Sequence, residues 1–144
     1  MCEVKSMGFE IGLHTAGVDS QQLCSVLPLV DWVGLDIKAK TDDYPGVTGA
    51  PFSGQRAWHS LAALQRSGVA YEVRTTLHPH LLPAAALMDL VKDLAGCGVT
   101  HYVVQEYRST IDFAHALPET ASYLTPSFCA TLVRELPALT VRRA

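Results

Sequence analysis

Apolar segments rich in valine, isoleucine and tyrosine alternate along this chain with segments of helical period, and this alternation constrains the fold most strongly. It is typical of βαβ units, in which a helix connects two parallel strands. The 144 residues suffice for a single domain of this kind. The predicted strands are Glu10–Thr15, Val30–Lys38, Tyr71–His78, His101–Tyr107 and a short one at Leu139–Arg142. The predicted helices are Ser20–Leu27, Gly54–Ser67, Pro83–Ala95 and Pro126–Glu135.

The second and third predicted strands carry polar residues at every second position, although parallel strands that are buried on both faces are usually apolar throughout. The period of two places Asp36 and Lys38 on one face of the second strand. It gathers Arg74 and His78 on the polar face of the third. If helices cover the apolar faces, the polar faces line the concave side of a sheet or barrel, where α/β enzymes bind ligands at strand ends. The pattern therefore predicts a polar ligand site.

Simpler interpretations of the same residues remain open. An antiparallel sheet with one solvated face gives the same alternation, but the long helical connections and the lack of an Asn-Gly or Asp-Gly turn disfavour it. Asp36 and Lys38 could form a plain ion pair. His14 and His78 could be hydrogen-bonded structural residues rather than ligands or bases.

The segment Ala39–Ser53 is longer than most connections inside compact domains. Its prolines and glycines, Pro45-Gly46 and Gly49-Ala50-Pro51, are too many for a helix. We predict an irregular loop there, which serves either as a lid over a site or as a plain surface excursion.

Composition excludes several classes of partner. The formal charge of -3 provides no basic field for nucleic acid or anionic lipid. The most apolar stretch, Leu23–Ile37, is interrupted by Pro28, Asp31 and Asp36, so we expect neither a membrane span nor a secretory leader. A cytoplasmic protein is the resulting expectation.

The four cysteines are separated by 22, 73 and 32 residues, so no Cys-x-x-Cys pair can hold zinc or an iron–sulfur cluster. We expect no disulfides and predict that the thiols are small buried hydrophobic groups. They are Cys2, Cys24, Cys97 and Cys129.

Four motifs, each at the end of a predicted strand, resemble those of a known family. They are His14-Thr15-Ala16-Gly17, Asp36-Ile37-Lys38, Arg74-Thr75-Thr76-Leu77-His78-Pro79 and Gln105-Glu106-Tyr107-Arg108. In this order they resemble the radical S-adenosylmethionine activating enzymes of glycyl-radical proteins, most closely the type that activates anaerobic ribonucleoside-triphosphate reductase. The resemblance spans about Met7 to Arg108.

The resemblance implies a partial (β/α) barrel of four to five mostly parallel strands with helices on its outer face. It implies binding of S-adenosylmethionine and a [4Fe-4S] cluster, which generate a 5'-deoxyadenosyl radical that abstracts hydrogen from a glycine of a partner protein. By resemblance, Asp36 and Lys38 hold the amino acid end of S-adenosylmethionine or help to order a cation beside it, and Arg74 faces its ribose and carboxylate. The other cofactor-binding residues that it implies are Thr15, His78 and Gln105.

The sequence departs from the family in one respect that decides how the chain can work. The Cys-x-x-x-Cys-x-x-Cys loop, whose thiolates bind the cluster, is absent, and neither catalytic nor metal-binding residues are assigned. One hypothesis is therefore the C-terminal portion of an activase, inactive as an isolated chain. The alternative is a truncated, cluster-less binding or interaction domain without redox activity.

The expected organisation follows from the family pattern. Residues 1–9 form a helix tail, residues 10–108 the core βα units, and residues 109–144 a C-terminal extension. Because a full barrel needs about 250 residues, this chain would leave one strand edge and a concavity uncovered. We expect the chain to associate with a missing N-terminal segment or with a second copy, in addition to a glycyl-radical protein.

Overall fold

The computed structural model describes residues 1–108, 117–118 and 120–143. Part of the expected C-terminal extension, namely residues 109–116, 119 and 144, lies outside the described residues. The chain divides into two compact units, Met1–Arg74 and Thr75–Ala144.

The strands form a five-stranded sheet in the order β1-β2-β3-β4-β5. The pairs β1–β2, β2–β3 and β4–β5 are parallel, which confirms the α/β class and overturns the antiparallel alternative. Each strand matches its predicted position within two residues. Their bounds are Gly12–Thr15 for β1, Trp32–Asp36 for β2, Ala70–Leu77 for β3, Tyr102–Glu106 for β4 and Leu139–Arg142 for β5.

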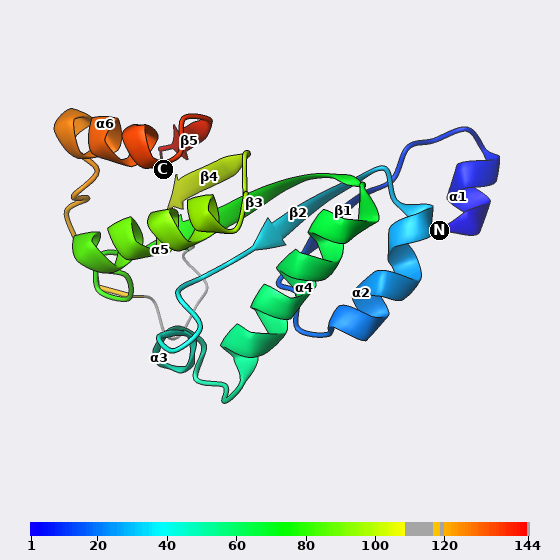
Figure 1. Cartoon of the computed structure of the whole chain (residues 1–144), viewed down its shortest axis with the longest axis horizontal. Helices are drawn as coiled ribbons and strands as arrows, with labels where there is room; N and C mark the ends of the chain where they lie inside the picture. The colour runs from blue at the N-terminus through cyan, green and yellow to red at the C-terminus, as the bar shows by residue number, and fades with distance from the viewer. Residues whose placement is uncertain (109–116, 119, 144) are drawn as a thin grey trace. The chain divides into compact units, whose positions relative to one another are not determined.

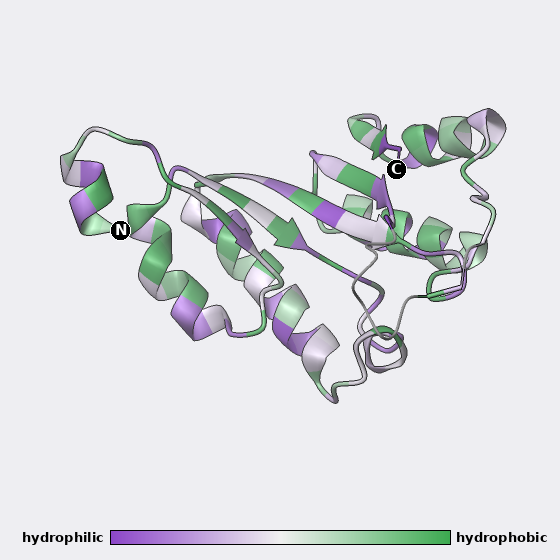
Figure 2. Ribbon diagram, turned by 180° about the vertical axis from the view of Figure 1, so that it is seen from behind, coloured by the Kyte–Doolittle hydropathy of each residue, from purple (hydrophilic) through white to green (hydrophobic). Residues whose placement is uncertain are grey.

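In the first unit, helices α2 (Ser20–Val26) and α4 (Ser53–Ser67) pack side by side on one face of the strands (Figure 1). Every second residue of β2 faces this layer, and Val33 and Leu35 are fully buried. The strands show the same alternation as hydrophobic and hydrophilic bands (Figure 2). The face of β2 that α2 and α4 leave uncovered therefore carries its polar residues.

In the second unit, α5 (Ala84–Gly96) supplies the core with a stripe of leucines, including the fully buried Leu87 and Leu94. Helix α6 (Pro126–Glu135) packs against α5 and β5. The largest fully buried side chain is that of Tyr102 in β4, whose hydroxyl donates to Thr75 Oγ1 at 2.8 Å. A buried hydroxyl needs such a partner, because an unsatisfied one costs about 1–3 kcal/mol.

The helix ends follow the local sequence. Asp19 caps α2, because its carboxylate accepts from the backbone N–H of Gln21 and Gln22. Gly68 ends α4 in the left-handed region, with φ of 74°, which suits a residue without a side chain. Helix α1 (Cys2–Ser6) lies where a helix tail was expected, and the 3-10 helix η1 (Leu27–Leu29) follows α2.

The prediction of an irregular loop over Ala39–Ser53 is wrong in one part, because Tyr44–Thr48 forms helix α3. Pro45 lies in the first turn, where backbone N–H groups form no hydrogen bond within the helix, so the lack of an N–H in proline costs nothing there. Gly49 ends the helix with φ of 68°. The breakers therefore mark the two ends of a short helix rather than prevent it.

The prediction that the cysteines are buried is also wrong. Cys2, Cys24 and Cys97 are exposed and Cys129 is partly exposed, and none of the four forms a disulfide. Helix α1 buries no residue, and Cys97 is the residue that follows the last turn of α5. Among the described residues, no helix is both long enough and apolar enough to cross a membrane.

Gly54→Ala should destabilise the first unit. A Cβ at Gly54 would lie 2.3 Å from the Thr41 carbonyl oxygen, which is backbone and cannot rotate away. We expect the free energy of unfolding to fall by about 1–3 kcal/mol, measured by urea denaturation. Gly46→Ala is the matched control, since a Cβ there meets nothing within 4 Å. An equal or larger loss from Gly46→Ala would contradict this packing.

Candidate functional site

An ion pair joins Asp36, the last residue of β2, to Arg74 inside the neighbouring strand β3. The two residues are direct partners in the parallel register, so their side chains leave the sheet on the same face. Asp36 Oδ1 accepts from Arg74 Nε at 3.1 Å and from Arg74 Nη2 at 2.7 Å. The side chains are 27% and 13% exposed, so the pair is only partly screened by solvent.

Lys38 extends this pair into a group of three charged side chains. Its Nζ lies 3.8 Å from Asp36 Oδ2, beyond hydrogen-bond length, so this ammonium group can donate to a ligand. Asp36 Oδ2 can accept from a ligand, because the two Arg74 bonds use Oδ1. The group thus offers two cations and one carboxylate oxygen within a small area, which suits a ligand with both a carboxylate and an ammonium group.

Tyr44 of α3 fixes the backbone from which these charges project. Its hydroxyl accepts from Lys38 N–H at 3.0 Å and donates to the Asp36 carbonyl oxygen at 3.4 Å. The side chain is 2% exposed, and burial raises the pKa of Tyr44 to about 12, so the hydroxyl stays protonated and able to donate.

Trp58 of α4 holds the same segment at a second point, since its Nε1–H donates to the Ala39 carbonyl oxygen at 3.2 Å. The segment that follows β2 is therefore tied at Asp36, Lys38 and Ala39. These bonds hold the start of the segment Ala39–Ser53 beside the charged group.

An aromatic pair lies on the same face of the sheet as Asp36. His14 of β1 is opposite Gly34 in the register, and its ring meets Trp32 edge-on with centroids 5.2 Å apart. A Cβ at Gly34 would lie 2.6 Å from His14 Nδ1, so glycine is needed for the ring to occupy this place. His14 therefore packs against strand β2 through its ring and is exposed to solvent.

Thr15 does not join the charged group. It is opposite Leu35 in the register, which puts it on the face covered by helices. Its Oγ1 accepts from Gly17 N–H at 3.1 Å and so shapes the turn after β1. That turn is tight, because a Cβ at Gly17 would lie 2.9 Å from Ser60 Cβ, and the Ser60 hydroxyl donates to the Gly17 carbonyl oxygen.

His78 and Gln105 belong to the second unit. His80 N–H donates to His78 Nδ1 at 3.2 Å, so this nitrogen must be the unprotonated one. The proton then lies on Nε2, which donates to the Pro118 carbonyl oxygen at 3.0 Å. Both ring nitrogens of this buried histidine are occupied, as in its structural interpretation.

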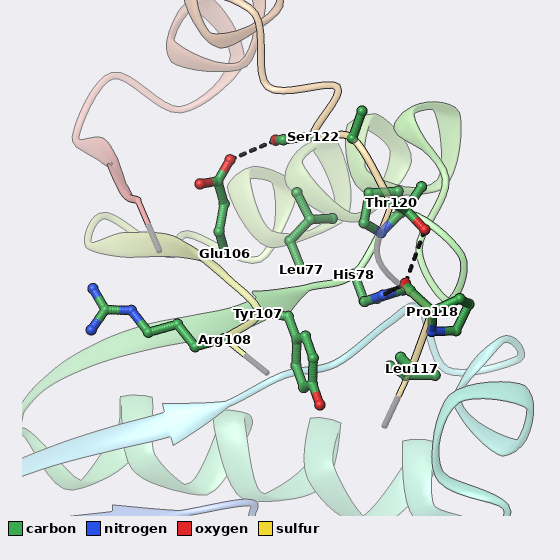
Figure 3. Close-up of a pocket in the computed structure, with 11 residues that line it drawn as sticks. Leu77, His78, Glu106, Tyr107, Arg108, Leu117, Pro118, Thr120 and Ser122 are labelled. Carbon is green, nitrogen blue, oxygen red and sulfur yellow. Dashed lines mark hydrogen bonds between the residues drawn. The ribbon is translucent and has the colours of Figure 1, made fainter. Parts of the chain in front are cut away.

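Gln105 donates from Nε2 to Thr76 Oγ1 at 2.8 Å, which links the ends of β3 and β4. Next to this pair, a cavity of about 710 Å³ lies at the carboxyl ends of the same strands (Figure 3). Its walls combine Leu77, Tyr107 and Leu117 with the carboxylate of Glu106. The second unit thus has a mixed polar and apolar cavity where the strands end, in agreement with the general rule for α/β folds.

Sequence patterns did not assign Tyr44 or Trp32 to the site. The available signal for Tyr44 was that it is the first aromatic residue after Asp36-Ile37-Lys38 and directly follows the polar run Lys40-Thr41-Asp42-Asp43. Trp32 had a signal as well. It lies two residues before Gly34 and four before Asp36, so the period of two places all three on the same face of the strand.

No protein-family model matches this chain, and no curated relative matches it either. Among solved structures, it is similar to the crystal structure of a domain of pyruvate-formate lyase-activating enzyme from Bacteroides vulgatus ATCC 8482. The TM-score is 0.68 at 10% sequence identity, over 96% of this chain and 84% of that chain. At this identity the likeness shows the fold alone, and it agrees with the α/β fold expected from the sequence.

Tyr44→Phe should weaken the stability of the first unit in a pH-dependent way. Because burial raises the pKa of Tyr44 from 10.0 to about 12, its ionisation favours the unfolded chain at high pH. The Tyr44 hydroxyl should therefore make its full contribution to the free energy of unfolding below pH 10, and this contribution should fall between pH 10 and 12.

Urea denaturation of both proteins at pH 8 and pH 11.5 measures this effect. The wild-type chain should lose about 2 kcal/mol more than the Tyr44→Phe variant between these pH values. An identical pH dependence of the two proteins would contradict the burial of this hydroxyl.

Proposed function

We propose that this chain is the S-adenosylmethionine-binding part of an activase that forms a glycyl radical on a partner protein. One observation carries the proposal, namely that Asp36, Lys38 and Arg74 meet where β2 ends beside its parallel neighbour β3. Its support is the complementarity between this group and an amino acid zwitterion. The fold, which is similar to that of a pyruvate-formate lyase-activating enzyme domain, is consistent with this activity.

Each of the three side chains has a distinct task in this proposal. Asp36 Oδ2 accepts from the ammonium group of the methionine moiety, while Lys38 donates to its carboxylate. Arg74 holds Asp36 in place through Oδ1 and directs its remaining N–H groups towards the carboxylate and ribose. Because Arg74 is rigid and planar and always charged, it orients Asp36 better than a lysine could.

The tie from Tyr44 gives this binding group its orientation. Its hydroxyl holds the backbone on both sides of Ile37, so Asp36 and Lys38 keep a fixed spacing before the ligand arrives. Such preorganisation lowers the entropy lost on binding. Bound S-adenosylmethionine supplies a 5'-deoxyadenosyl group as the radical carrier of the reaction.

The residues of this chain do not fit the [4Fe-4S] cluster that the activases use. In residues 1–108, 117–118 and 120–143, no group of three or more His, Cys, Asp or Glu side chains could hold a metal ion. The proposal for this chain is therefore confined to the binding of S-adenosylmethionine, with the cluster held by another segment or polypeptide. The motifs favour anaerobic ribonucleoside-triphosphate reductase as the partner.

Asp36→Asn and Arg74→Gln should each weaken the binding of S-adenosylmethionine by about 10- to 100-fold, since a charge-assisted hydrogen bond contributes about 1.5–3 kcal/mol. Isothermal titration of the full chain under anaerobic conditions measures this. Methylthioadenosine, which lacks the amino acid part, should bind the Asp36→Asn variant as well as it binds the wild type.

Asp31→Asn is the matched control for these titrations. Asp31 forms a comparable ion pair with Lys5 at 2.8 Å, before the opposite end of β2. We expect the affinity of the Asp31→Asn variant for S-adenosylmethionine to stay within about twofold of that of the wild type. If the Asp36 and Arg74 variants bind S-adenosylmethionine like the control, the charged group does not bind this ligand. The alternative of a truncated, cluster-less binding or interaction domain is then favoured.

A further inference from the structure

Strand β1 of the first unit is an edge of the sheet. Among the described residues it pairs with β2 alone, in parallel register from Gly12 to Thr15. Edge strands in folded proteins are usually blocked by lysine or proline, because their unpaired backbone groups attract further strands. Residues 9–15 contain neither lysine nor proline, and Glu10 is the single acidic residue among them. This edge is therefore open to pairing with another strand.

The backbone of β1 presents every second residue to this edge. Both backbone groups of Ile11 point towards β2, because its N–H donates to Asp31 Oδ2 at 2.8 Å and its carbonyl oxygen accepts from Asp31 N–H at 2.9 Å. In a parallel strand, the N–H and C=O of one residue point to one side and those of the next residue to the other. The backbone groups of Glu10, Gly12 and His14 therefore point away from β2.

The segment around Gly12 is complementary to itself in an antiparallel arrangement. If Gly12 of one copy faces Gly12 of a second copy, Glu10 lies opposite His14 of that copy. These are the residues whose backbone groups point outwards, so each facing pair can exchange two hydrogen bonds. The side chains of Glu10 and His14 are exposed, and a carboxylate accepts from an imidazole N–H. The twofold symmetry forms this polar pair twice.

On the other face of β1, the same arrangement pairs apolar side chains. Ile11 and Leu13 are only partly buried in the single chain, and Ile11 of one copy lies opposite Leu13 of the other. Phe9, which is 60% exposed, lies opposite Thr15. Pairing removes part of this apolar surface from water, which favours association. Gly12 carries no side chain that could obstruct the twofold axis.

We propose that two copies of this chain pair through their β1 strands, antiparallel, about a twofold axis at Gly12. A second copy fits this edge because one segment supplies both members of each pair, as a twofold interface requires. An axis at His14 would instead place Glu10 opposite Val18, which loses the polar pair. The pairing uses none of the three charged residues assigned to S-adenosylmethionine, so it does not rest on the function proposed above.

Sedimentation velocity of the full chain in reducing buffer measures the pairing. Because a short pair of strands is a small interface, we expect a monomer–dimer equilibrium with a Kd between about 1 μM and 1 mM. Glu10→Lys should weaken the dimer at least about threefold, since both polar pairs are lost, and Glu10→Lys/His14→Glu should restore it. Asp42→Lys is the matched control, because it makes the same charge change at an exposed position of the same unit. A chain that stays monomeric at about 1 mM, or equal weakening by the control, would overturn the proposal.

Gly12→Cys tests the position of the axis without changing a charge. A Cβ at Gly12 meets only Trp32 Cε3, at 3.7 Å, so the substitution fits the single chain. Facing Cα atoms of a hydrogen-bonded antiparallel pair are about 5.5 Å apart, within reach of a disulfide. After mild oxidation with diamide, a non-reducing gel should show a covalent dimer of Gly12→Cys well above the background of the native cysteines. Gly46→Cys, at an exposed position where a Cβ meets nothing within 4 Å, should stay at that background. A dimer in sedimentation without this cross-link would mean that another surface pairs and would overturn the proposal.

Discussion

The ion pair between Asp36 and Arg74 is the interaction on which the candidate site depends. Residues 38 positions apart become direct neighbours because β2 and β3 pair in parallel register. The pairing continues past the strand end, where Ile37 N–H donates to the Arg74 carbonyl oxygen at 2.9 Å. Backbone and side chains thus hold the same junction, and both side chains are partly shielded from water. A partly buried ion pair of this kind contributes more to the orientation of the Asp36 and Arg74 side chains than to the stability of the fold.

The segment after β2 turns this junction into a shaped surface. Tyr44 and Trp58 bind backbone atoms of Asp36, Lys38 and Ala39, so helices α3 and α4 fix the direction in which the chain leaves the strand. Gly54 allows the close approach of α4 that these bonds require. The polar site is therefore built on the rigid layer of strands and helices, which suits precise recognition of a ligand.

The strands and the polar faces were predictable because a period of two in the sequence reports directly on which side chains share a face. Asp36 and Arg74 could thus be assigned to polar faces, but the register that joins them depends on contacts between distant segments. Helix α3 escaped prediction because Pro45 and Gly49 are breakers inside a helix and favourable at its ends. The exposure of Cys24 depends on which face of α2 packs, and that of Cys97 on its place after the last turn of α5. A scattered residue type carries no information on either.

The most direct test of the central claim follows the Arg74 side chain while S-adenosylmethionine binds. In ¹⁵N-labelled protein, the Nε–Hε signal of Arg74 reports on the bond to Asp36 Oδ1. The account predicts that this signal shifts and saturates as S-adenosylmethionine is added, and that methylthioadenosine, which keeps the ribose but lacks the amino acid part, shifts it less. Saturable binding of S-adenosylmethionine with no change in the Arg74 signal would contradict the assignment of this ion pair to the ligand.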